Sequence, residues 1–272
     1  MKSLFVAISG LFFLSTSAQP RLEKLWETDS TLAIPESVLP QPKKGVLFVA
    51  LVDGTPWEMD GKGAIAKLDL NGSIINANWA SGLNAPKGMG IYGNKLYVAD
   101  VKDVAVINLA SGKVERRIPV AGAEKLNDIT IDSKGVVYVS DSQTGIVHSI
   151  RKGKVQTYLT GFKGLNGLRA VGSELYVATG KDVYRTDKNK NLTSIGVIDQ
   201  GGDGIEPIGN GDWIGSAWVG YIYYIHANGK RDLLLDTHEQ KINTADIGYD
   251  PIRKIVYVPT FFKKSVVAYQ LK

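Results

Sequence analysis

The sequence contains no cysteine among its 272 residues. This absence excludes a disulfide framework, catalysis by a thiol and metal sites built on thiolates. Histidine is nearly as scarce, because the chain has three. The stability of the fold must therefore come from packing and backbone pairing rather than from cross-links.

Long apolar runs are also lacking. The longest, Leu4 to Leu14, has 11 residues and is too short to span a bilayer. It follows Lys2 and precedes the small residues Ser15 to Ala18, which is the arrangement of a secretory signal peptide. We expect residues 1–18 to be a signal, with an uncleaved anchor as the alternative, and residues 19–272 to form one exported domain, secreted or periplasmic, with no membrane span once the signal is removed.

Clustered positive charge is the third absence. The net charge of +5 is spread without a tract of Lys or Arg, so we expect no nucleic-acid partner. The chain has no G-x-S-x-G nucleophile elbow. Its Gly201-Gly202 pair lacks the Lys or Ser of a phosphate loop. These observations leave a small molecule as the expected partner.

A β-hairpin pattern is what the sequence has in abundance. In the stretch from Lys125 to Asp141, two apolar runs flank the turn from Asp132 to Gly135. The second run recurs at intervals of 38 to 49 residues, beginning at Leu47, Leu96, Val137, Leu175, Trp213 and Val256. A repeat of about 40–45 residues is typical of a propeller blade. The sequence therefore predicts an all-β fold, a six-bladed β-propeller of four-stranded blades.

The two ends of the domain predict how the ring closes. The sixth repeat stops after its third strand, Ser265 to Leu271, whereas the segment around Leu25 precedes the first repeat. We expect this N-terminal segment to supply the missing outer strand of the sixth blade, which would remove an open sheet edge.

Polar residues begin most of the predicted inner strands, which line the central channel. Aligning the repeats places one residue of each blade at this position, namely Glu36, Lys87, Asn127, Asn166, Asp203 and Ala245. Four of the six carry oxygen donors, which hard divalent cations favour. The alternative is that Asn and Asp occur here only because they hydrogen-bond nearby backbone. The ordered set, one per blade, favours a metal site, and the absence of His from it argues against a dedicated zinc or copper site.

Four short motifs make a resemblance specific. They are Pro35-Glu36-Ser37, Leu126-Asn127-Asp128, Leu165-Asn166-Gly167-Leu168 and Gly202-Asp203-Gly204. With them the chain resembles the SMP-30/gluconolactonase family, the regucalcin-like six-bladed propellers. The resemblance implies one divalent metal held by Glu36, Asn166 and Asp203, with Ca²⁺ as the first choice and Zn²⁺, Mn²⁺ or Mg²⁺ as alternatives. It also implies a catalytic role for Asp203.

The same resemblance implies substrate contacts. Asn127 would lie close to both metal and substrate, and Lys125 stands where family members often have a substrate-contacting Arg. Lys87, from the ring of inner-strand residues, would contact a substrate anion or form an ion pair with Glu36. Asp128 and Asp246, one residue after the ring positions, are expected to pack between blades.

Two functions from different classes follow. The first is a metal-dependent hydrolase of a lactone or related cyclic ester, in which Asp203 orients or deprotonates water. The second is a non-catalytic exported propeller that binds a small ligand or a protein. A substrate-sized pocket above Asp203 would favour the enzyme, and a sealed channel mouth would favour the binding protein.

Overall fold

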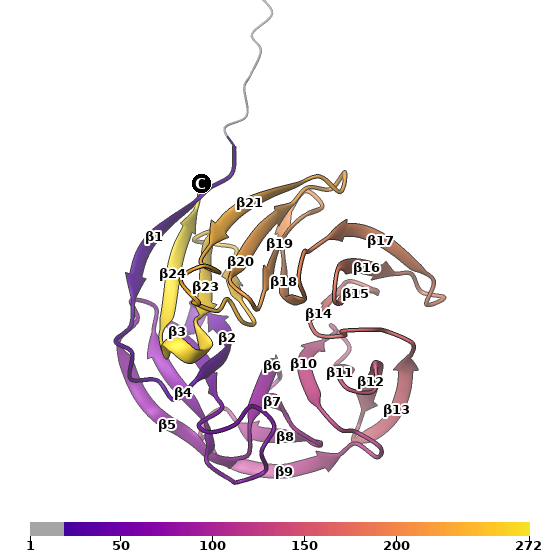
Figure 1. Cartoon of the computed structure of the whole chain (residues 1–272). Coiled ribbons are helices and arrows are strands. Elements are labelled where there is room, and N and C mark those ends of the chain that lie inside the picture. Colours follow the sequence, from indigo (N-terminus) through magenta and orange to yellow (C-terminus); the bar gives the residue numbers. More distant parts are fainter. Residues whose placement is uncertain (1–18) are drawn as a thin grey trace, which may run out of the picture.

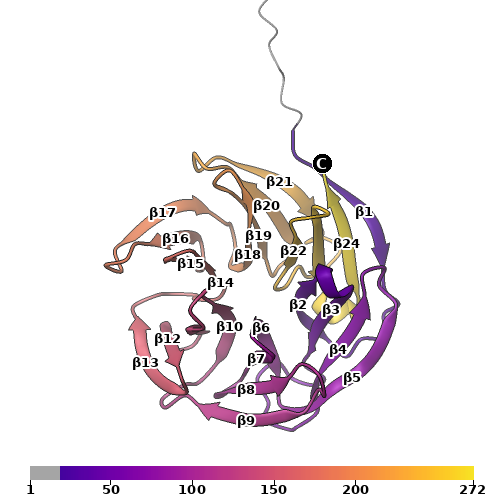
Figure 2. The same ribbon diagram turned by 180° about the vertical axis from the view of Figure 1, so that it is seen from behind.

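The computed structural model describes residues 19–272, and the predicted signal segment 1–18 lies outside the described residues. The described chain forms six four-stranded antiparallel sheets arranged in a ring, as Figure 1 shows. Figure 2 shows the ring from behind, with the outermost strands β5, β9, β13, β17, β21 and β1 along its rim. The predicted six-bladed β-propeller is therefore confirmed.

Each of the first five blades uses four consecutive strands. Blade one contains β2 (Pro35–Gln41), β3 (Val46–Leu51), β4 (Gly63–Asp69) and β5 (Ile74–Leu83). Blade two contains β6 (Pro86–Tyr92), β7 (Lys95–Asp100), β8 (Asp103–Asn108) and β9 (Val114–Pro119). Blade three contains β10 (Leu126–Ile131), β11 (Val137–Asp141), β12 (Ile146–Arg151) and β13 (Lys154–Leu159).

Blade four contains β14 (Leu168–Val171), β15 (Glu174–Ala178), β16 (Asp182–Thr186) and β17 (Leu192–Val197). Blade five contains β18 (Gly202–Gly209), β19 (Asp212–Ala217), β20 (Tyr221–Ile225) and β21 (Arg231–Asp236). Blade six contains β22 (Gly248–Asp250), β23 (Ile255–Pro259), β24 (Val266–Leu271) and β1 (Leu22–Glu27). Two short 3-10 helices, η1 (Pro42–Lys44) and η2 (Phe261–Lys263), interrupt the loops. Within residues 19–272, no helix is long and apolar enough to cross a membrane.

The ring closes as the two ends of the domain predict. Strand β1 pairs antiparallel with β24, from Leu22 opposite Leu271 to Glu27 opposite Val267. The indole of Trp26 on β1 donates a hydrogen bond to the carbonyl of Leu70, which lies on the neighbouring blade one, at 3.2 Å. The pairing joins the two ends of the described chain in one sheet, and the Trp26 bond ties that sheet to blade one.

The turn from Asp132 to Gly135 shows why the alternating runs fold into hairpins. The Asp132 carboxylate accepts hydrogen bonds from the amides of Lys134 and Val136 at 2.8 and 2.9 Å. Gly135 has φ +77°, in the left-handed region that favours glycine. The flanking strands then pair with Ile129 opposite Val139. The local sequence thus specifies this hairpin.

The blades pack on one another through their apolar faces. One cluster joins blade one to blade six and includes the fully buried Leu47, Val49 and Tyr257, with Trp26 packed against it. Equivalent clusters occupy the other five blade interfaces. Burial of these side chains is the main stabilising contribution available to a chain without disulfides.

Candidate active site at the mouth of the central channel

β-Bulges set the site residues apart from the regular sheet. In blades one, two, three and five, the pairing of the inner strand with its neighbour shifts register within its first few residues. The residues inside these shifts include Glu36, Lys87, Asn127 and Asp203. A bulge leaves a residue outside the ladder and redirects its side chain. The sequence repeat predicts these positions, but it does not predict the bulges.

Two of the three predicted metal ligands, Glu36 and Asn166, have a buried oxygen atom without a hydrogen-bond partner. Glu36 and Asp203 are 5% and 2% exposed. The Oε2 atom of Glu36 and the Oδ1 atom of Asn166 are buried and accept no hydrogen bond. A buried acceptor without a partner is costly, and a bound cation would satisfy both atoms. The donor set of two carboxylates and an amide oxygen suits a hard divalent ion.

Burial also raises the pKa values of both carboxyls. The pKa of Glu36 rises to about 8 through burial, although the Lys87 ammonium opposes the increase. The pKa of Asp203 lies well above its usual range, first through burial and then through the charges of Glu36 and Asp246. A bound cation would oppose this increase, because it favours the charged form of both carboxyls.

Lys87 lies beneath a loop of blade one, a contact that the sequence pattern does not predict. Its side chain is 2% exposed, and its Nζ atom donates to the carbonyls of Pro56 and Ala85 at 2.7 and 3.2 Å. The Trp57 ring lies over the ammonium, 4.6 Å from Nζ to the ring centroid. Burial lowers the pKa of Lys87, against the opposing charge of Glu36. Lys87 makes no ion pair within 4.0 Å in the described chain, so the loop residues, not Glu36, hold its ammonium.

Lys125 lies near the same loop, and Asn127 lies at the start of the inner strand β10. The Nζ atom of Lys125 is 5.8 Å from the Trp57 centroid, so the indole has two ammonium groups nearby. Asn127 is 7% exposed, and its Nδ2 atom donates to the Ser142 hydroxyl at 3.0 Å. The structure therefore brings Lys125 and Lys87 to one indole. Their contact with a substrate stays a prediction.

Two aspartates fix the loops that lead into the inner strands. Asp141 ends β11 and accepts hydrogen bonds from the amides of Glu124 and Lys125 at 2.8 and 3.2 Å. Asp100 ends β7 and accepts hydrogen bonds from the amides of Asn84 and Ala85 at 2.9 Å. Both close a repeated second strand ending in Ala-Asp or Ser-Asp, which was the available sequence signal for this positioning role.

Asp128 and Asp246 join neighbouring blades, which is the role expected for them. Asp128 accepts hydrogen bonds from the amides of Ile129, at 2.6 Å, and of Leu168 on the next blade. Asp246 accepts a hydrogen bond from the Ser37 hydroxyl at 2.6 Å, between blades six and one. Both aspartates are thus engaged by protein groups rather than free for a metal.

A further ion pair was not foreseen. Arg169 and Glu206 form a salt bridge at 3.0 Å between blades four and five. Burial raises the pKa of Glu206 to about 7 against the charge of Arg169, and that of Asp246 to about 6 against the Ser37 hydrogen bond. These residues line a cavity of about 20 Å³ in the channel, which is room for one water molecule.

Histidine takes no part in the channel mouth. His148 lies on β12, a third strand. His226 follows β20, and its Nε2 atom lies 2.7 Å from Asp232 Oδ2. His238 follows β21 and stacks on Tyr221 with ring centroids 5.2 Å apart. Within residues 19–272, no group of three or more His, Cys, Asp or Glu is arranged to hold a metal. The predicted site depends instead on carboxylate and amide oxygens together.

Comparison with known proteins shows the fold. No family model and no curated protein sequence matches the chain. Among solved structures, a candidate gluconolactonase is similar at 12% identity and a TM-score of 0.69, covering 94% of this chain and 93% of its own. A streptogramin B lyase is similar at 12% identity and a TM-score of 0.64, covering 93% of this chain and 98% of its own.

A third similar structure is a catalytically inactive His-to-Ala variant of virginiamycin B lyase from Staphylococcus aureus, solved with quinupristin. It has 13% identity and a TM-score of 0.59, and covers 93% of this chain and 99% of its own. At these identities the similarities establish a shared propeller fold.

Proposed function

We propose that the protein is a metal-dependent hydrolase of the gluconolactonase type, acting on a lactone or a related cyclic ester at the channel mouth. The observation that carries this proposal is the pair of unpartnered oxygens, Glu36 Oε2 and Asn166 Oδ1, in the same ring of residues as the buried Asp203. The candidate gluconolactonase with the same fold supports the reaction class.

Under this proposal, the site residues have distinct roles in hydrolysis. Glu36, Asn166 and Asp203 would hold the ion, which supplies Lewis acidity toward the carbonyl oxygen and the charge that develops on it. Asp203 orients a water molecule and accepts its proton, a role suited to a carboxylate whose burial makes it more basic. Asn127 positions the substrate, because its amide lies at the mouth and is oriented by Ser142.

Hydrolysis fits the chain better than elimination of the lyase kind. The lyase relative was made inactive by replacing a histidine, whereas none of the three histidines of this chain lies in the ring of inner-strand residues. Mass spectrometry separates the two reactions, because hydrolysis adds the mass of water to the substrate and elimination leaves the mass unchanged.

A non-catalytic binding protein is the second candidate, and one observation favours it. The loop carrying Pro56 and Trp57 covers Lys87, so part of the channel mouth is closed. Under this alternative the metal would stabilise a binding platform. Export belongs to both candidates, and N-terminal sequencing of the native protein should find a chain that begins near Gln19.

Calorimetric titration of metal tests the site. After chelator treatment, wild type should bind one divalent cation, and Asp203→Asn and Glu36→Gln should bind it at least about tenfold more weakly. Asp187→Asn, in an exposed turn of blade four, is the control and should match wild type. Equal metal affinity in wild type and Asp203→Asn would refute the ligand assignment.

Turnover is measured in parallel on a panel of lactones. Asp203→Asn should abolish hydrolysis while circular dichroism shows the same β-sheet signal as wild type. Metal binding without turnover of any lactone would move the function to the non-catalytic candidate.

A further inference from the structure

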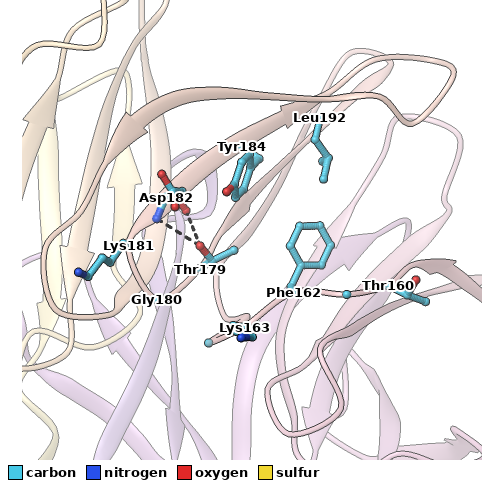
Figure 3. Close-up of a pocket in the computed structure, with 11 residues that line it drawn as sticks. Thr160, Phe162, Lys163, Thr179, Gly180, Lys181, Asp182, Tyr184 and Leu192 are labelled. Carbon is cyan, nitrogen blue, oxygen red and sulfur yellow. Dashed lines mark hydrogen bonds between the residues drawn. The ribbon is translucent and has the colours of Figure 1, made fainter.

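A cavity of about 650 Å³ lies on blade four, away from the channel mouth. Its walls come from the linker before β14, the turn between β15 and β16, and the outer strands β16 and β17. Figure 3 shows the side chains of Phe162, Tyr184 and Leu192 facing one another across it. The volume is in the range of small-molecule sites.

The walls of the cavity are bonded directly to the segments that carry the site. The Gly180 amide donates to the Lys163 carbonyl at 3.3 Å, and the Gly202 amide donates to the Thr179 carbonyl at 3.0 Å. Gly202 immediately precedes Asp203, and Lys163 lies three residues before Asn166. The linker leads into the inner strand at the end where β15 terminates. Cavity and candidate metal site therefore open at the same end of the propeller.

The lining is apolar on one side and carries three charged residues on the other, Lys163, Lys181 and Asp182. The Phe162 and Tyr184 rings lie 6.3 Å apart at 50°, and Leu192 is 44% exposed. Lys163 is exposed and forms no ion pair in the described part of the chain, and in Figure 3 it lies below Phe162 and Thr179. Lys181 points away from the rings in the same view. Such a surface suits an apolar ring that bears an anionic group.

The reach from site to cavity sets the size of the ligand. Neighbouring strands lie about 4.8 Å apart, so Tyr184 on the third strand and Leu192 on the fourth lie about 10 and 14 Å outward from the inner strand. A substituent about as long as a naphthyl group on a short linker spans this distance.

We propose that the blade-four cavity binds the distal arm of the substrate, an aromatic ring carrying a carboxylate or similar anion. This inference rests on the proposed function for the identity of the reacting end, but not for the binding of the ring. Phe162, Tyr184 and Leu192 contact the ring, and Lys163 contacts the anion. The cavity thereby selects ring-bearing substrates over small unsubstituted lactones.

The direct test uses the carboxylate of 2-naphthaleneacetic acid (2-naphthylacetate), which contains no ester bond for the enzyme to hydrolyse. Binding is followed by ligand-observed NMR titration. Phe162→Ala should weaken binding at least about fivefold. Phe262→Ala, an equally conservative truncation of a phenylalanine that is 57% exposed on η2, should leave binding unchanged. Leu192→Ser is the second variant if Phe162→Ala unfolds, as judged by its melting curve.

The charge is tested with a matched neutral probe, 2-(2-naphthyl)ethanol. Lys163→Ala should weaken binding of the carboxylate and not of the alcohol. Lys134→Ala, at an exposed turn on the opposite end of blade three, should affect neither. Equal binding of both probes to wild type and Lys163→Ala would overturn the assigned anion contact.

Turnover separates this inference from the proposed function. A naphthylmethyl-substituted γ-butyrolactone should lose kcat/KM in Phe162→Ala, whereas the unsubstituted lactone should not. Naphthylacetate binding that depends on Phe162 in a protein without turnover would support the cavity and refute the hydrolase. Binding unaffected by both Phe162→Ala and Leu192→Ser would overturn the cavity proposal, whatever the activity.

Discussion

At the scale of single residues, two glycines make room for the buried aspartates of the channel. A Cβ atom on Gly88 would lie 2.3 Å from Asp128 Oδ1, and one on Gly204 would lie 2.5 Å from Asp246 Oδ1. Each glycine directly follows a ring position, Lys87 or Asp203. Glycine is therefore required here by the close approach of the next blade.

We expect Gly204→Ala to lower the free energy of unfolding by about 1–3 kcal/mol, because the added methyl group overpacks the contact with Asp246. Chemical denaturation measures the change. Gly180→Ala is the matched control, since its Cβ would meet nothing nearer than 3.6 Å. A Gly204→Ala protein as stable as Gly180→Ala would contradict the tight contact.

The candidate site residues share one position in the sequence repeat. The equivalent placement of Glu36, Asn127, Asn166 and Asp203 was predictable from the repeat, because each lies at or just before the start of an inner strand. Their roles in metal and substrate binding stay predictions. The covering of Lys87 was not, because the loop that reaches it comes from another blade. Nothing in the local sequence around Trp57 specifies a contact with a residue 30 positions later.

At the scale of elements, strand pattern and ring closure were predictable, since alternation and turn residues are local signals. The β-bulges were not, because a bulge depends on how two strands align after they pair. Two elements lead to testable predictions, namely the loop over Lys87, which shields its ammonium, and strand β1, which closes the ring.

We expect Trp57→Ala to uncover Lys87. In wild type, Lys87 should resist acetylation while exposed lysines react, because Pro56 and Trp57 hold its ammonium. In the variant its acetylation should rise several-fold, as read by peptide mass spectrometry. Acetylation of exposed Lys134 serves as the internal reference. Equal labelling of Lys87 in both proteins would show that the loop does not shield it.

Strand β1 should be held mainly through Trp26. We expect Trp26→Ala to cost about 2–4 kcal/mol of unfolding free energy, because the indole packs on Tyr257 with centroids 5.9 Å apart and bonds to Leu70. Leu25→Ala, at a neighbouring side chain that is 47% exposed, should cost about 0.5 kcal/mol or less. Urea denaturation of both variants measures the difference, and similar losses would refute the role of Trp26.

At the scale of the whole molecule, the channel gathers ionisable groups from every part of the ring. The pKa values of Asp246, Glu206 and Glu36 are raised to about 6, 7 and 8. The folded protein therefore binds more protons than the unfolded chain between about pH 4 and pH 8. The stability that these three carboxyls contribute is fully present below their unfolded pKa values and is lost as the pH rises through their folded pKa values.

We expect the metal-free protein to melt several degrees lower at pH 8 than at pH 5. Glu206→Gln should flatten this dependence, because it removes one of the titrating carboxyls, whereas Glu124→Gln at an exposed position should not. Adding the divalent cation at pH 8 should raise the melting temperature by mass action. A melting temperature that rises from pH 5 to pH 8 in the metal-free protein would contradict the raised pKa values.

The bulges at the starts of four inner strands separate the residues that form the hydrogen-bond ladders of the ring from the residues of the candidate site. A side chain outside the hydrogen-bond ladder can be exchanged without disturbing the pairing of its blade. Positions 36, 87, 127 and 203 thus form a small interchangeable set on a constant scaffold. New chemistry at this mouth is therefore within reach of a few point mutations, which makes these positions the natural targets for laboratory evolution.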